Sequence, residues 1–112
     1  MNASLPAQLT TTATSLRGVC GLTANVDASH GGLLAVEVLD SRGYRLRGFD
    51  RDAAVPIVDT DSVGAAVAWR DKALKDLPAE VSFRCHLRGN VSLFALNPVS
   101  YTHLTLPTIL LV

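Results

Sequence analysis

The sequence predicts an all-β fold, an antiparallel β-sandwich with a jelly-roll-like arrangement of short strands. Two observations predict it. Apolar residues recur at every second position in several short segments, which is the period of strands with one buried face. Clusters of glycine, serine, asparagine and aspartate separate these segments, and such spacing with little helix is typical of a β-sandwich.

The clearest strand lies in EVSFRCHLRG, at residues 80–89. One face carries the apolar side chains Val81, Phe83, Cys85 and Leu87, and the other carries Ser82, Arg84, His86 and Arg88. Full burial of each larger apolar side chain stabilises the fold by about 1.5–3 kcal/mol. A slip of one residue would expose all of them, so the register is strongly specified.

Four further segments are predicted as strands. In residues 20–29, Leu22, Ala24 and Val26 alternate with Thr23, Asn25 and Asp27. In residues 31–40, Leu34, Val36 and Val38 share one face, with Ala35 and Glu37 opposite. Residues 64–69 predict a strand with Val67 and Trp69 on its apolar side. Residues 90–97 are apolar on both faces, as in a central strand.

The connections have the composition of turns. Asp40 to Gly43 is predicted to be a hairpin loop with its glycine in the left-handed conformation. Ser29–Gly32 and Arg88–Asn90 predict two more tight connections. An irregular loop with Pro56 is expected between Phe49 and Ser62. Residues 71–77 predict no more than a turn or two of helix, which Pro78 would stop.

The length of 112 residues suits one domain, and its ten basic residues balance its ten acidic ones. No basic stripe is present, which argues against a nucleic-acid partner. The beginning of the chain lacks the features of a signal peptide, and the final apolar run is far too short to span a membrane, which takes roughly 20 residues. We expect an unstructured segment at 1–7, a sandwich at 8–97 and a non-native tail at 98–112.

The expectation for the tail comes from its codons. The ten residues from Val99 to Thr108 can be encoded by DNA that resembles the transposase end and adapter of sequencing libraries, as in a metagenomic read. We therefore expect Pro98–Val112 to be foreign, Tyr101 and His103 to carry no chemistry, and the last natural strand to be truncated. The alternative is a natural edge strand followed by a hydrophobic terminus.

The order of landmarks LLAVEVLDSRGYRLRGF, VPIVDTDS, VAW and VSFRCHLRGNVSLFAL carries a family resemblance. It resembles the C-terminal β-sandwich of bacterial secreted proteins in which the sandwich follows a five-bladed β-propeller, similar to sucrose- or arabinan-cleaving glycoside hydrolases or sialidases. The matched positions are Val36, Glu37, Val38, Asp40, Gly48, Phe49, Asp61, Ser62, Trp69, Arg84, His86, Leu87, Arg88, Leu93 and Phe94. The sequence departs from the pattern at Arg45–Arg47, which replace a proline-containing turn, and at Cys85, where an aromatic residue is usual.

This resemblance implies a fragment of a larger protein involved in carbohydrate metabolism. The fragment would be a non-catalytic accessory module that packs on a β-propeller domain of the same polypeptide and stabilises it. The parent protein would be extracellular or periplasmic, and its catalytic carboxylates would lie on the propeller. No catalytic, cofactor-binding or metal-binding residue is therefore assigned to this chain, and no cofactor is expected.

A carbohydrate-binding module, with a polysaccharide as partner, is the alternative function. Such a module needs flat aromatic side chains exposed together. Tyr44, Trp69 and Phe49 are the candidates, but Trp69 and Phe49 match core positions of the family pattern. Stacking on Tyr44 alone would be weak.

Other chemistry-bearing residues have a structural interpretation beside the functional one. Cys20 and Cys85 could form a disulfide across the sandwich, and the favoured interpretation is two buried thiols. The aspartates Asp50, Asp52, Asp59 and Asp61 could bind Ca²⁺ but lack the spacing of a calcium loop, so a solvated loop capped by Asp61 or Ser62 is favoured. No two acids are placed for glycoside cleavage. His30 and His86 lack a third ligand, and His86 is expected to be exposed.

Overall fold

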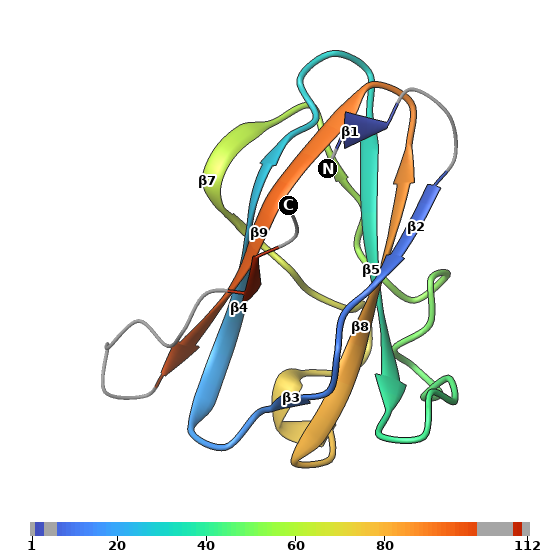
Figure 1. The fold of residues 1–112 in the computed structure, drawn as a ribbon, viewed down its shortest axis with the longest axis vertical. Coiled ribbons are helices and arrows are strands. Elements are labelled where there is room, and N and C mark those ends of the chain that lie inside the picture. Colours follow the sequence, from blue (N-terminus) through green and yellow to red (C-terminus); the bar gives the residue numbers. More distant parts are fainter. Residues whose placement is uncertain (1, 4–6, 101–108, 111–112) are drawn as a thin grey trace.

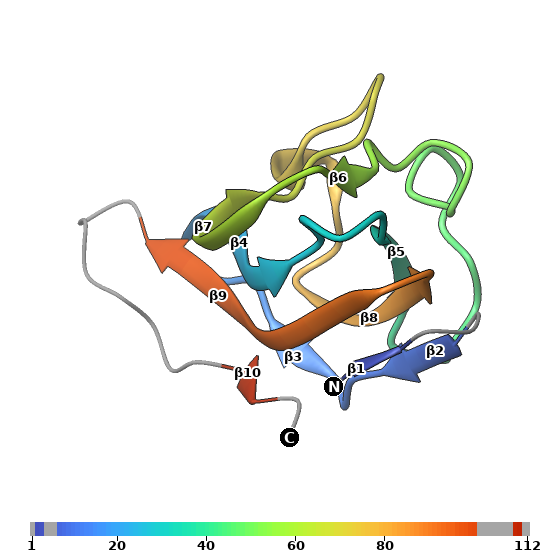
Figure 2. The ribbon, with the colours of Figure 1, turned by 90° about the horizontal axis from the view of Figure 1, so that it is seen from above.

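The computed structural model describes residues 2–3, 7–100 and 109–110, and it confirms the β-sandwich: two antiparallel sheets pack face to face (Figures 1 and 2). Sheet A has the order β1-β9-β4-β7, and β10 also pairs with β9. Its strands are β1 (Asn2–Ala3), β4 (Val19–Asp27), β7 (Asp61–Ala66), β9 (Val91–Ser100) and β10 (Ile109–Leu110). Sheet B has the order β2-β8-β5-β6, and β3 also pairs with β8. Its strands are β2 (Ala7–Thr10), β3 (Thr14–Ser15), β5 (Leu33–Asp40), β6 (Ile57–Val58) and β8 (Glu80–Arg88).

The four long strands form the centre of the sandwich in a jelly-roll-like pattern. The chain crosses from sheet A to sheet B between β4 and β5, and returns from B to A between β8 and β9. Because β4 pairs with β9 and β5 with β8, the two crossings lie side by side.

The predicted alternation fills the space between the sheets. Along β8, Val81, Phe83, Cys85 and Leu87 are all buried. They meet Leu22, Ala24 and Val26 from β4, and Leu34, Val36 and Val38 from β5, in one core cluster. The alternation therefore predicted the inward faces of these three strands correctly.

The predicted strand at 64–69 is wrong in its position. Strand β7 ends at Ala66, and Val67 and Trp69 are buried beyond its end. The chain leaves sheet A there because its backbone pairs with another segment: Trp69 forms an isolated bridge with Ala54. The Trp69 indole Nε1 also donates a hydrogen bond to the backbone oxygen of Val36 in sheet B, at 2.8 Å.

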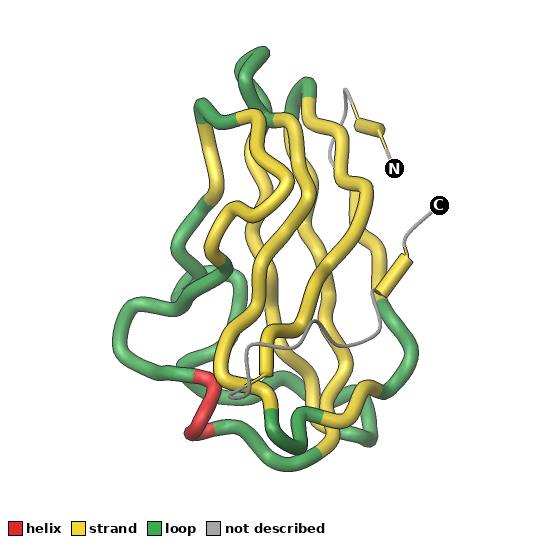
Figure 3. The backbone as a smooth tube through the Cα atoms, turned by 90° about the vertical axis from the view of Figure 1, so that its left-hand side faces the viewer, coloured by secondary structure: helices red, strands yellow, loops and turns green. Residues whose placement is uncertain are grey.

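The tight connections are confirmed. Gly31, Gly43 and Gly89 all have positive φ angles, which glycine adopts without steric cost. In the β5 hairpin, Asp40 Oδ1 accepts hydrogen bonds from the backbone N–H groups of Arg42 and Tyr44, both at 2.9 Å. The segment predicted to form a turn of helix contains the 3₁₀ helix η1 (Leu74–Asp76), drawn in red in Figure 3.

Both ends of the chain add residues to sheet A. Within the segment expected to be unstructured, β1 pairs with β9 at Ser92 and Val91, and Ala7 begins β2. Within the expected foreign tail, β9 continues to Ser100 alongside β4. Free edges of β9 and β8 offer backbone partners to such segments. Tyr101 and His103 lie outside the described residues.

Gly32 is required by a close approach between two connections. A Cβ atom at this position would lie 2.3 Å from the backbone oxygen of Asn90. We predict that Gly32→Ala lowers the free energy of unfolding by about 1–3 kcal/mol, because the backbone must shift to relieve the overlap. Gly64→Ala is the matched control, since a Cβ there meets nothing within 4 Å. Urea denaturation with equal losses for both variants would contradict this packing.

Candidate functional site

The outward face of sheet B gathers charged and polar side chains in rows across the strands. His86 is the direct partner of Gln8 on β2 and of Ala35 on β5. In the next row, Arg84 is the partner of Thr10 and Glu37, and on the other side Arg88 is the partner of Leu33. Since opposed residues share a face of the sheet, these rows form one continuous surface.

Glu37 is the only charged residue in this surface that is fully buried, with 1% of its area exposed. His86 Nε2 lies 2.9 Å from Glu37 Oε1. Arg45 Nε lies 3.4 Å from Oε2, and Arg84 Nη1 lies 3.9 Å from Oε1. A carboxylate only accepts hydrogen bonds, so Nε2 of His86 is the donor. Three basic side chains thus compensate the burial of one acid.

The expectation that His86 is exposed is wrong. Its side chain is only 12% exposed, because Glu37, two residues along β5 from its direct partner Ala35, offers it a hydrogen-bond acceptor. Glu37 was predicted to face away from Val36 and Val38, which is confirmed. Its burial on that second face was not predicted.

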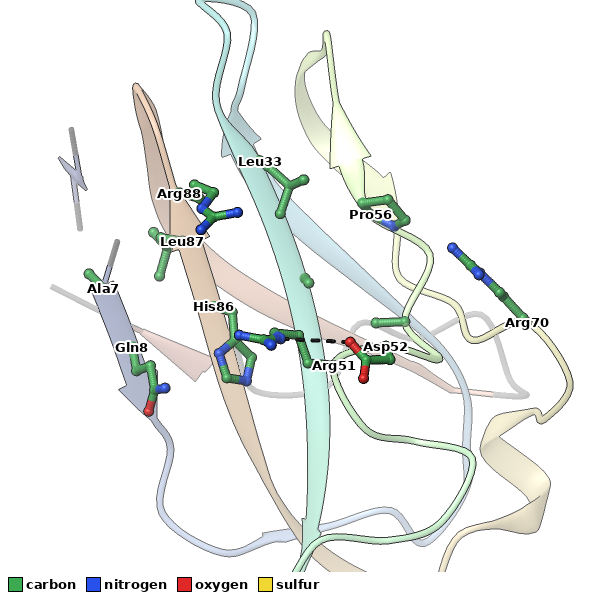
Figure 4. A pocket seen from close by; sticks show the side chains of 12 residues that line it. Ala7, Gln8, Leu33, Arg51, Asp52, Pro56, Arg70, His86, Leu87 and Arg88 are labelled. Atoms are coloured by element: carbon green, nitrogen blue, oxygen red, sulfur yellow. Dashed lines mark ion pairs between the residues drawn. The ribbon is translucent and has the colours of Figure 1, made fainter. Parts of the chain in front are cut away.

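A groove of about 560 Å³ lies beside this cluster, between sheet B and the segment that follows β5. It is lined by Ala7, Gln8, Leu33, Ala35, Arg51, Asp52, Ala54, Pro56, Arg70, His86, Leu87 and Arg88. Figure 4 shows Arg51 reaching across β5 toward His86, and Arg88 pointing from β8 toward β5. Arg70 lies on the far side of the loop that carries Pro56.

The basic residues of this groove come from distant parts of the sequence. Three arginines and one aspartate line it, in a chain whose charges balance. Arg51 Nε lies 4.0 Å from Asp52 Oδ1, and both side chains are largely exposed, so this pair is weak. This group of arginines could not be predicted from the sequence, because Arg51, Arg70 and Arg88 form no run or periodic stripe.

The outward face of sheet A has the opposite character. In β4, β7 and β9 the only charged residues are Asp27 and Asp61, which are direct partners at one end of the sheet. Val63 on β7 and Phe94 on β9 are exposed by 78% and 46%. A second cavity, of about 380 Å³, lies against β4 and is lined mainly by apolar side chains, including Leu22, Trp69 and Leu74.

The aspartates of the 49–62 loop do not converge. Among the described residues, no three side chains of the metal-binding types lie close enough to share an ion. Asp50 Oδ1 accepts the backbone N–H of Ala53 at 2.9 Å, and Ser62 Oγ accepts that of Gly64 at 3.1 Å. The Ser62 contact is the turn cap that the sequence favoured over a calcium site, and the Asp50 contact was not predicted.

The two cysteines are free thiols with different surroundings: Cys20 is exposed and Cys85 is buried. The interpretation of two buried thiols is therefore wrong for Cys20. The register of β4 against β9 shifts between Val19 and Gly21, and this bulge places Cys20 out of phase with Leu22. Burial raises the pKa of the Cys85 thiol to about 12.

The aromatic side chains are not gathered on the surface. Phe49 and Trp69 are both buried and pack edge to face, with ring centroids 5.2 Å apart. Tyr44 is 67% exposed in the β5 hairpin. His30 is also exposed, with Nδ1 at 4.0 Å from Asp27 Oδ1. Among the described residues, the exposed aromatic rings are therefore those of Tyr44 and Phe94. Tyr44 follows β5 of sheet B and Phe94 lies on β9 of sheet A, so they do not form one stacking surface for a sugar.

Comparison of the chain with protein-family models, with curated proteins and with solved structures found no match. In the part of the chain that the structure describes, no helix has the length and hydropathy needed to cross a membrane.

The thiols provide a direct test of the strand register. A protonated, buried thiol is a poor nucleophile, so we predict that a thiol reagent at neutral pH modifies Cys20 in the folded protein and leaves Cys85 intact. Both should react in denaturant. Mass spectrometry of the labelled peptides distinguishes the sites. Labelling of Cys85 as fast as Cys20 in the folded protein would contradict the bulge and the core position.

Proposed function

We propose that this chain is a non-catalytic accessory module of a larger carbohydrate-active protein, and that the outward face of sheet A packs on the neighbouring domain. The neighbour that the family resemblance suggests is a β-propeller of the glycoside hydrolase or sialidase type. The observation that carries the proposal is the scarcity of charge on sheet A, since the centres of protein interfaces are depleted of charged residues.

The distribution of charge between the two sheets supports this assignment. Strands β4, β7 and β9 of sheet A contain no charged residue except Asp27 and Asp61. The side chains of Val63 and Phe94 on these strands are exposed. Sheet B carries arginines, a histidine and acidic residues on its outward face. Exposed apolar groups on an otherwise uncharged sheet are typical of a surface that another domain covers.

A cavity against β4 lies beside this surface, and its lining includes the core residues Leu22 and Trp69. It opens where β4 approaches the segment from Ala66 to Leu74, and its apolar lining could accept an anchoring side chain of a partner. A buried apolar anchor in a pocket commonly contributes much of the affinity of an interface.

The acids of the described residues support a non-catalytic role. Glu37, which is buried, is held by His86 and two arginines. Glycoside cleavage instead needs two carboxyl groups facing one cleft, about 5–10 Å apart, and the groove on sheet B is lined by the single acid Asp52. The alternative function, carbohydrate binding by stacking, has Tyr44 as its support.

We predict that the isolated chain self-associates through sheet A, because the face has no partner to cover it. The double variant Val63→Lys/Phe94→Lys should abolish this association by placing like charges on the face. The matched control is Val55→Lys/Val58→Lys, which changes two valines that are each 44% exposed. Val58 lies in β6 of sheet B, and Val55 precedes that strand. Sedimentation velocity over a range of concentrations measures the effect.

A wild-type chain that stays monomeric at all concentrations would contradict the proposed face. So would a control variant that loses association as fully as the sheet A variant. Pull-down on insoluble polysaccharides that Tyr44→Ala abolishes would favour the carbohydrate-binding module instead.

A further inference from the structure

We propose that the groove on sheet B binds a sugar acid, that is, a carbohydrate unit that carries a carboxylate as well as hydroxyl groups. The groove is built by this chain alone and lies on the sheet opposite the proposed packing face. The inference therefore does not rest on the identity of the neighbouring domain.

The basic side chains supply the carboxylate site. Arg88 and Arg51 point over the groove from opposite sides (Figure 4), and both side chains are exposed. A guanidinium fork matches the geometry of a carboxylate and binds it through two parallel hydrogen bonds. Neither side chain is engaged by a buried acid: the acid at the groove, Asp52, contacts Arg51 at 4.0 Å and is 93% exposed.

The neighbouring cluster keeps these arginines available. The buried acid of sheet B, Glu37, is already compensated by His86, Arg84 and Arg45. The groove itself is lined by three arginines and one aspartate, and none of these three arginines is a partner of Glu37. A local excess of positive charge in a chain with no net charge attracts an anionic ligand.

The remaining lining favours a hydroxylated anion over a simple one. Gln8 offers an amide, and Asp52 offers a carboxylate that accepts hydrogen bonds. The Asp52 carboxylate accepts hydrogen bonds from sugar hydroxyl groups, a contact that a phosphate or sulfate dianion, which has no hydroxyl group on carbon, does not offer in the same way. Leu33, Ala35 and Ala54 form an apolar surface that suits the C–H groups of a sugar ring.

The size and composition of the groove agree with this ligand class. A volume of about 560 Å³ lies in the usual range for small-molecule sites, about 300–1,000 Å³. Among the described residues, no phenylalanine, tyrosine or tryptophan lines it, which disfavours a neutral sugar held by stacking and a single-stranded nucleic acid held by base stacking. Charge and hydrogen bonding would carry the recognition.

Titration of the ¹⁵N-labelled full chain with trigalacturonate tests the proposal, with neutral galactotriose, inorganic phosphate and a short single-stranded DNA as comparison ligands. We expect trigalacturonate to shift the amide signals of Gln8, Ala35, Arg51 and Arg88, and to bind at least tenfold more tightly than the other three ligands. Arg51→Gln/Arg88→Gln should weaken the binding by about tenfold or more, because hydrogen bonds to charged groups are lost.

The matched control is Arg17→Gln/Arg42→Gln, which removes the same charge from two exposed arginines outside the groove. It should bind trigalacturonate as the wild-type chain does. Equal binding of the neutral trisaccharide, preference for phosphate or DNA, equal losses in both double variants, or no binding would each overturn the proposal. Since these arginines are exposed, thermal unfolding should show that both variants retain the fold.

Discussion

The structure depends on the burial of strand β5 on both of its faces. Leu34, Val36 and Val38 fill the core, and Ala35 and Glu37 are buried on the opposite side. One edge of β5 pairs with β8 along its whole length, and the other receives β6 and the backbone around Phe49. A strand so enclosed can hold an acid only if basic partners compensate it, and this requirement brings His86, Arg84 and Arg45 together.

The two sheets present outward faces of different chemistry. On sheet B, Glu37 pairs with His86, Arg84 and Arg45, and Arg51 and Arg88 line the groove. On sheet A, the strands contain little charge, and Val63 and Phe94 remain exposed. These are the two faces that we propose for an anionic ligand and for a neighbouring domain, respectively. The sandwich keeps these two surfaces apart.

The sequence predicted those features that depend on local periodicity. The inward residues of β8, such as Phe83, follow from alternation, and the turns at Gly43 and Gly89 follow from backbone preferences. It failed where the cause is tertiary. Cys20 is exposed because a bulge against β9 changes the phase of β4. His86 is only 12% exposed because the register with β5 brings it to Glu37, 49 positions away in the sequence.

The interaction between Glu37 and His86 is tested most directly by a double-mutant cycle on the free energy of unfolding. It requires Glu37→Ala, His86→Ala and the double variant, each measured by urea denaturation. If the buried acid depends on this partner, the double variant is less destabilised than the sum of the single variants, with a coupling energy of about 0.5–3 kcal/mol. Additive effects of the two substitutions would show that β5 tolerates its buried acid without His86, and would contradict the central role of this contact.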